Sequence, residues 1–186
     1  MSDRAITPRG VNHIVLNVRN LDASHRFWTE IMGFKCVAEL KDRPWKMRFY
    51  SGVDEQGGVT HHDLALAEAA ADGEAGPQAW SMQPRRIGLN HVAVAWPDRD
   101  SWLKQVEFLQ SRGVNFLRRV NHGMTHSVYI EDPDGHGIEV LYELPREVWE
   151  HDIDAAQNYV EHLPTDGPAA LVDRTDNPVF GKALTG

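Results

Sequence analysis

Residues 10–16 read GVNHIVL and residues 88–94 read GLNHVAV, so the same strand-like pattern begins twice in the chain. In both copies apolar and polar residues alternate, as in a β-strand with one buried face. An apolar stripe at helical spacing follows each copy, and Gly33 and Gly113 stand where the two helices should end. Short strand patterns follow each helix. The sequence therefore predicts an α+β fold built from two tandem βαβββ modules.

The repeat also sets the expected domain boundaries. The first module is predicted at residues 10–66 and the second at 88–143. The segment between them, 67–87, is rich in Ala, Gly, Pro and acidic residues, and reads as a linker that Trp80 anchors. Residues 144–186 are predicted to form a partly helical C-terminal arm with an extended end. Each sheet would pack one face on its helix and leave the other to curve around a site.

Helix starts are predicted from residues that can accept backbone hydrogen bonds. Asp22 precedes the first apolar stripe and Asp100 stands at the same place in the second module. Aspartate is among the preferred residues at a helix N-terminus, because its carboxylate accepts from unpaired N–H groups there. The two are therefore expected to cap the two helices.

Composition excludes several classes of function. A net charge of −8 argues against nucleic acid or an anionic membrane as the main partner. Cys36 is the only cysteine, which excludes an internal disulfide and favours a reducing compartment. No apolar run approaches the roughly 20 residues of a membrane helix, and the polar start of the chain lacks a signal-peptide core. We expect a cytoplasmic protein.

The second module ends in a hairpin with unusual chemistry. Residues 132–135 read DPDG, a sequence typical of a tight turn between two strands. Glu139 follows within an apolar strand, where a carboxylate is costly to bury unless it is paired or binds a metal. His122, His126 and Tyr129 crowd the same hairpin. The hairpin is therefore predicted to form one wall of an oxidative active site.

The repeat places histidines at equivalent positions. His13 and His91 occupy the same site in the first strand of each module, on the face opposite the helix. His62 lies in the predicted last strand of the first module, as Glu139 does in the second. A lone strand histidine is more often structural, but two at equivalent positions with an inward carboxylate favour a metal site. Two imidazoles and one carboxylate are typical of non-haem Fe(II) enzymes that bind substrate and O₂.

With these residues in view, the chain resembles the vicinal oxygen chelate superfamily, and within it the small, single-domain type I extradiol ring-cleaving dioxygenases. The matching stretches are GVNHIVLNV, HHDLAL, GLNHVAV and NHGMTHSVYIEDPDGHGIEV. The resemblance implies that His13, His91 and Glu139 are the iron ligands. It implies that His62 is the acid–base histidine, with His61 as the open alternative. It also implies that His122 and Tyr129 contact the substrate oxygens.

The resemblance further implies the partners. Fe(II) is the expected metal, with Mn(II) possible on the same ligands, and the substrates are O₂ and a catechol or 2,3-dihydroxybiphenyl in aromatic hydrocarbon catabolism. A homodimer or higher homo-oligomer is expected. Two other readings stay open. One is a glyoxalase-type isomerase or thiol transferase that uses another divalent metal, and the other is a non-enzymatic module that binds aromatic drugs.

Overall fold

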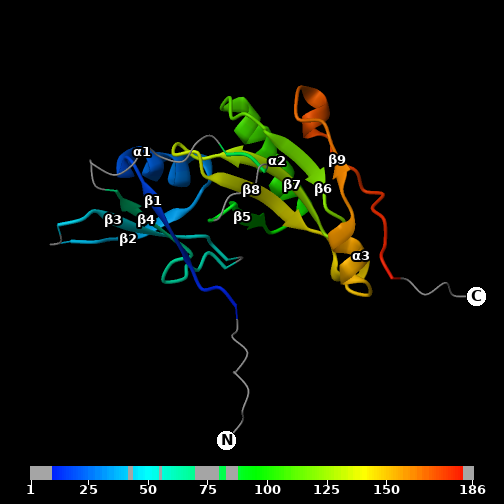
Figure 1. Cartoon of the computed structure of the whole chain (residues 1–186), viewed down its shortest axis with the longest axis horizontal. Coiled ribbons are helices and arrows are strands. Elements are labelled where there is room, and N and C mark those ends of the chain that lie inside the picture. The colour runs from blue at the N-terminus through cyan, green and yellow to red at the C-terminus, as the bar shows by residue number, and fades with distance from the viewer. Residues whose placement is uncertain (1–9, 42–43, 55, 70–79, 83–87, 182–186) are drawn as a thin grey trace, which may run out of the picture. The chain divides into compact units, whose positions relative to one another are not determined.

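The computed structural model describes residues 10–41, 44–54, 56–69, 80–82 and 88–181. The chain divides into two compact units, Met1–Gly76 and Pro77–Gly186. We describe each unit by itself (Figure 1).

Unit 1 contains one four-stranded sheet and one helical segment. Its elements are β1 (Ile14–Val18), α1 (Leu21–Arg26), the π-helical turn η1 (Phe27–Ile31), β2 (Lys35–Glu39), β3 (Met47–Ser51) and β4 (Leu64–Glu68). The strand order is β1-β4-β3-β2, with β1 parallel to β4 and the other pairs antiparallel. This is the predicted βαβββ order, although the first strand begins at Ile14 rather than at residue 10.

Unit 2 repeats the arrangement. Its elements are β5 (His91–Trp96), α2 (Arg99–Ser111), β6 (Arg118–Asn121), β7 (Thr125–Glu131) and β8 (Gly137–Glu143). Here too the first and last strands of the module, β5 and β8, are parallel neighbours, and β7 pairs antiparallel with β8 and with β6. The predicted α+β fold of two tandem βαβββ modules is confirmed.

The predicted helix caps were wrong by two residues in both units. Asn20 caps α1 by accepting from the backbone N–H of Ala23, and Asp98 caps α2 by accepting from that of Ser101. Asp22 and Asp100 lie inside the first turn, where their carboxylates cannot reach back to these donors. The predicted helix ends hold, because Gly33 and Gly113 both adopt positive φ just beyond their helices.

Each helix buries aromatic side chains against its own sheet. Trp28 in unit 1 and Trp102 in unit 2 are both fully buried. Trp102 also donates from its indole nitrogen to the backbone oxygen of Val140 at 3.0 Å, which ties α2 to the central strand β8. The tie leaves the opposite face of β8 available for other contacts.

The C-terminal arm is more ordered than the sequence suggested. It contains the 3₁₀ turn η2 (Arg146–Val148), α3 (Ile153–Asn158), the short strand β9 (Glu161–His162) and the 3₁₀ turn η3 (Pro168–Leu171). β9 pairs antiparallel with β6, so the arm extends the sheet of unit 2 by one strand. Of the predicted linker, 67–69 and 80–82 are described, and Ala67 and Glu68 belong to β4; the rest of that prediction falls outside the described residues.

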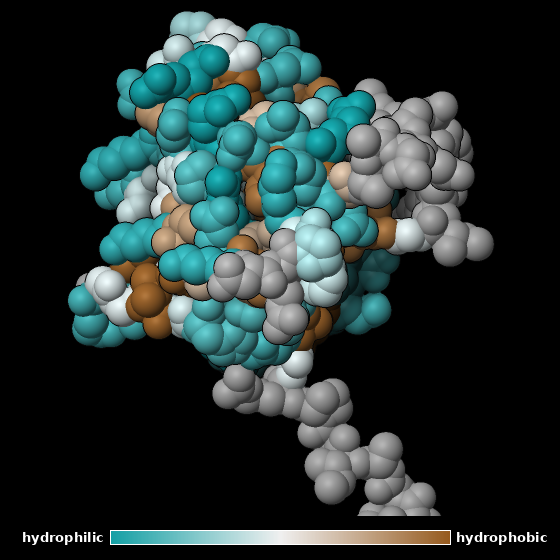
Figure 2. All heavy atoms as spheres, turned by 90° about the vertical axis from the view of Figure 1, so that its left-hand side faces the viewer, coloured by the Kyte–Doolittle hydropathy of each residue, from teal (hydrophilic) through white to brown (hydrophobic). Residues whose placement is uncertain are grey.

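The exposed surface is mostly hydrophilic. On the face drawn in Figure 2, hydrophilic side chains predominate and apolar ones show in separate patches. Large apolar side chains that stand out from the surface include Val11, Leu89 and Trp45. Among the described residues, no helix is both long and apolar enough to cross a membrane.

Candidate metal centre

The face of the unit 2 sheet that carries the candidate site is defined by alternation along β7 and β8. Tyr129 and Glu139 are direct cross-strand partners, so their side chains share one face. Ile138 and Val140, on either side of Glu139, point to the opposite face and are fully buried. Glu139 itself is only 7% exposed, as the sequence predicted for a carboxylate in an apolar strand.

His91 lies against this carboxylate. Its Nε2 is 3.0 Å from Oε2 of Glu139, and its Nδ1 is 2.7 Å from Oδ1 of Asn90. Because an amide oxygen only accepts, Nδ1 carries the ring proton and donates to Asn90. Nε2 therefore points at a carboxylate oxygen, and a cation bound there would take the place of the hydrogen-bonding proton between the two atoms. Two electron-pair donors that converge in this way form the kind of site that a cation occupies.

The same orientation occurs in unit 1. Nδ1 of His13 is 2.8 Å from Oδ1 of Asn12. Nε2 is therefore the ring nitrogen that remains to bind a metal ion through its electron pair. Metal-binding histidines commonly donate their other N–H to an oxygen, which fixes the tautomer and the ring orientation. The asparagines precede the histidines in both copies of the repeat. No role was predicted for these asparagines, although the repeated Asn–His pair is visible in the sequence.

Glu139 is ionised in this setting. Burial by itself raises the pKa of the carboxyl group, but hydrogen bonds from His91, Ser127 and Tyr129 outweigh it and hold the pKa below its ordinary value. An ionised, mostly buried carboxylate beside an imidazole fits a divalent cation in charge and in donor type.

His122 and Tyr129 form a hydrogen-bonded pair on the same face, with 3.0 Å between Nε2 and the phenol oxygen. Burial lowers the pKa of His122, so its ring is neutral near pH 7. Burial and the charge of Glu139 raise the pKa of Tyr129, so its phenol keeps its proton. The structure thus joins His91, His122, Tyr129 and Glu139 in one cluster within unit 2.

Trp80 covers one side of this cluster. Its ring stacks on that of Tyr129 at a centroid distance of 5.5 Å, and its indole nitrogen donates to the backbone oxygen of Asn90. It packs so closely on Gly137 that a Cβ atom there would collide with the indole ring. Arg118 lies over the Tyr129 ring at 5.7 Å. Trp80 is therefore anchored, as predicted, and its anchor is the site face of unit 2.

In unit 1 the parallel pairing of β1 with β4 brings His13 and His62 together. His13 directly precedes β1, and His62 lies two residues before β4 rather than inside the strand as predicted. The centroids of the two rings lie 4.4 Å apart. His62 also packs on Phe49 at 5.1 Å, whereas His61 is exposed and lies 6.3 Å from His13. Burial and the adjacent imidazoles of His13 and His61 lower the pKa of His62.

The predicted site residues therefore fall into two groups, His13 with His62 in unit 1 and the four-residue cluster in unit 2. Within neither unit do the described residues form a group of three His, Cys, Asp or Glu side chains able to hold a metal ion. The predicted ligand set takes His13 from one unit and His91 and Glu139 from the other, and it stays a prediction.

His126, which lies in the same hairpin as His122 and Tyr129, is fully buried. It bonds Asp173 of the arm at 2.6 Å, on the face opposite the cluster. Alternation along β7 already separates it from Tyr129. Its partner, 47 residues further on, carried no signal in the sequence.

Comparison with known proteins gives a consistent family. The model of the glyoxalase/bleomycin resistance protein/dioxygenase superfamily matches residues 10–140. Catechol-2,3-dioxygenase of Bacillus subtilis is 27% identical over 81% of this chain and 46% of its own length. Biphenyl-2,3-diol 1,2-dioxygenase 3 of Rhodococcus globerulus is 30% identical over 73% of this chain and 63% of its own length. The chain thus spans about half to two thirds of these two dioxygenases.

Other relatives have different activities. A lactoylglutathione lyase of Pseudomonas putida is 28% identical over 72% of this chain and 85% of its own length. Among solved structures, a glyoxylase/bleomycin resistance protein/dioxygenase domain from Frankia sp. superposes with a TM-score of 0.56 at 23% identity, covering 75% of this chain and all of that chain. At this identity the superposition supports the fold alone. The chain belongs to the glyoxalase/bleomycin resistance protein/dioxygenase superfamily.

Proposed function

We propose that this protein is an extradiol ring-cleaving dioxygenase that inserts both atoms of O₂ into a catecholic aromatic at a non-haem Fe(II) site. The observation that carries the proposal is the repeated Asn–His pair. Asn12 and Asn90 hold the rings of His13 and His91 with Nε2 free, and in unit 2 that nitrogen faces the ionised Glu139. Two dioxygenases among the relatives support the same reading.

His13, His91 and Glu139 would hold the metal, with Fe(II) expected and Mn(II) possible on the same donors. Two imidazoles and one carboxylate leave coordination positions open for a substrate and O₂. When bound, such a metal supplies the Lewis acidity that lowers the pKa of a catechol hydroxyl and the redox chemistry that activates O₂.

His122 and Tyr129 would orient the substrate. Tyr129 is a protonated phenol in a buried setting, and a hydrogen bond to a phenolate oxygen is stronger there than in water. His122 bonds the same hydroxyl, which limits the directions in which the phenol can point. Together they would stabilise negative charge that develops on the substrate oxygens.

His62 would move a proton. It is partly buried beside His13, and its lowered pKa keeps the ring neutral near pH 7. A neutral imidazole can accept a proton from a catechol hydroxyl and return it later in the reaction. His61 is exposed, and we assign it no part in this transfer.

A metal-dependent isomerase is the second candidate. The two Pseudomonas lactoylglutathione lyases are matched over 85% and 87% of their length, compared with 46% and 63% for the two dioxygenases named above. An isomerase needs no O₂, so anaerobic assay separates the two functions.

The test uses the full chain loaded with Fe(II) without air. O₂ uptake is then measured with catechol and with 2,3-dihydroxybiphenyl, while the visible absorbance of a ring-opened product is followed. We expect one O₂ to be consumed for each ring-opened product formed. Glu139→Gln should abolish this O₂ uptake, and substitution of the exposed His151 should leave it unchanged. No O₂ uptake with either diol from a protein that binds iron stoichiometrically would reject the proposal.

A further inference from the structure

The turn that carries His122 packs against the C-terminal arm. This turn, residues 122–125, joins β6 to β7 and is closed by a backbone hydrogen bond from His122 to Thr125. The backbone N–H of Leu144, at the start of the arm, donates to Met124 at 2.8 Å. The family match ends at residue 140, so the arm lies outside the shared part of the fold.

Gly123 shows how closely the arm approaches. It adopts a φ of +79°, and a Cβ atom there would lie 2.9 Å from the ring of Phe180 and 3.0 Å from the backbone oxygen of Ala156. Both contacts come from the arm. Phe180 is itself tied back by its N–H to the oxygen of Val148 at 2.8 Å. The turn therefore rests directly on two segments of the arm.

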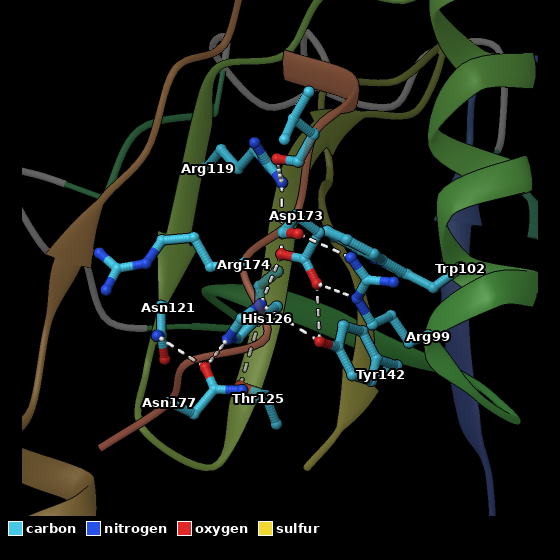
Figure 3. A network of polar contacts seen from close by, with 12 residues as sticks. Arg99, Trp102, Arg119, Asn121, Thr125, His126, Tyr142, Asp173, Arg174 and Asn177 are labelled. Carbon is cyan, nitrogen blue, oxygen red and sulfur yellow. Dashed lines mark hydrogen bonds and ion pairs between the residues drawn. The ribbon is translucent and has the colours of Figure 1, made fainter. Parts of the chain in front are cut away.

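A buried polar cluster fastens the arm to the helix-side face of the sheet (Figure 3). The side chain of Asp173 is fully buried and accepts from four side chains. These are Arg99 at 3.0 Å, His126 at 2.6 Å, Tyr142 at 2.8 Å and Arg119 at 3.4 Å. Arg119, 1% exposed, bonds the backbone oxygen of Val172 at 2.7 Å. Charge-assisted bonds out of water hold this part of the arm in place.

The cluster reaches the turn through Asn177. The N–H of Gly123 donates to Oδ1 of Asn121, so the amide nitrogen of Asn121 faces Oδ1 of Asn177. The same oxygen of Asn177 lies 2.8 Å from Nε2 of His126. His126 thus has an acceptor at each ring nitrogen, Asp173 at Nδ1 and Asn177 at Nε2.

We propose that the arm is a clamp that positions His122, and that His126, which bonds Asp173 and Asn177 of the arm, is its centre. The clamp fixes Asn121 and Gly123, the residues on either side of His122, while the His122 ring bonds Tyr129 on the opposite face of the sheet. The proposal rests on the proposed function for the role of His122, but not for the clamp itself. His122 is the contact residue, and Asn177 and Phe180 are positioning residues.

The test compares substitutions at Asn177. Asn177→Leu removes the acceptor that His126 and Asn121 share, whereas Asn177→Asp keeps an acceptor for both donors. Thr175→Ala, an exposed change two residues away on the arm, is the matched control. Phe180→Ala removes the second support of the turn independently. The melting temperature of each variant shows whether it is folded.

Two readouts need no substrate. Hydrogen exchange with mass spectrometry measures protection of the peptide that spans residues 118–127, and ¹⁵N NMR reports both ring nitrogens of His126 and of His122. We expect Asn177→Leu and Phe180→Ala to lose at least tenfold in protection of the turn, and Asn177→Asp and Thr175→Ala to match the wild type. The ¹⁵N shifts of His126 should change in Asn177→Leu and match the wild type in Thr175→Ala, since only the first substitution removes a contact of the ring.

Turnover adds the functional consequence. With a catechol substrate, Asn177→Leu should lower kcat by about tenfold or more with little change in KM, since misplacing a catalytic group by about 1 Å can cost a hundredfold. Unchanged protection of the turn in folded Asn177→Leu and Phe180→Ala would overturn the clamp. If protection falls as expected but no diol is consumed by the wild type, the clamp stands and the proposed function fails.

Discussion

Replacement of Asp173 by asparagine tests how much the buried cluster stabilises unit 2. The substitution keeps the shape of the side chain and removes its charge, so that Arg99 and Arg119 lose their shared counterion and His126 loses its carboxylate partner. Arg119 is 1% exposed, and within the described part of the chain its Nε has no hydrogen-bond partner even in the wild type. A buried charge that loses its partner typically costs about 3–5 kcal/mol.

The magnitude can be read as a urea midpoint. With an m-value of about 2 kcal/mol per M for a domain of this size, the loss corresponds to a shift of about 1.5–2.5 M. Hydrogen exchange of β7 and β8 peptides across a urea series follows unit 2 separately from unit 1. Asp176→Asn is the control, because its side chain is 78% exposed in its pair with Arg174 and such pairs contribute about 0–1 kcal/mol. A shift below about 0.5 M for Asp173→Asn would refute the reasoning.

The pH dependence of stability, the cap of α2 and the proton transfer by His62 can each be tested separately. Burial raises the pKa of Asp173, but hydrogen bonds from His126, Tyr142 and Arg99 outweigh it and hold the pKa below its ordinary value. The stabilisation is therefore complete above the unfolded value of about 3.9 and is lost as pH falls from there through the lower folded pKa, so acid unfolding of unit 2 below about pH 4 should be flatter in Asp173→Asn than in the wild type. Asp98→Ala should destabilise α2 by about 1 kcal/mol and Asp100→Ala by less than about 0.5 kcal/mol, since only Asp98 accepts from Ser101; equal effects in thermal unfolding would contradict the cap assignment. His62→Phe should lower kcat by about 10²–10⁴ at unchanged metal content, whereas the neighbouring His61→Phe should leave kcat within about twofold, and the reverse order would assign the proton transfer to His61.

The fold could be predicted because the sequence pattern of one module occurs twice in the chain. Strand alternation, an apolar helical stripe and a closing glycine recur in the same order, and two weak local signals that repeat are stronger than either alone. The caps could not be resolved in this way. Asn20 and Asp98 repeat just as Asp22 and Asp100 do, so the choice depends on which side chain reaches the N–H groups of the first turn.

The candidate site was predictable where it depends on alternation within a strand. The burial of Glu139 and its shared face with Tyr129 follow from the strand pattern alone. The setting of His126 was not predictable, because Asp173 lies in a segment without periodicity and is brought to β7 only by tertiary folding. The same holds for Trp80, whose stacking on Tyr129 depends on a close approach to Gly137.

The most direct test of the central claim is the metal content of single variants in the three proposed ligands. Wild type and the variants His13→Asn, His91→Asn and Glu139→Gln are loaded anaerobically with Fe(II), freed of excess metal and analysed by elemental emission. His136→Asn serves as a histidine control outside the set, since His136 bonds Asp132 in the hairpin turn. The account predicts about one iron per chain in the wild type and the control, and little in each ligand variant. Full iron content in His13→Asn would contradict the assignment of His13 as a metal ligand.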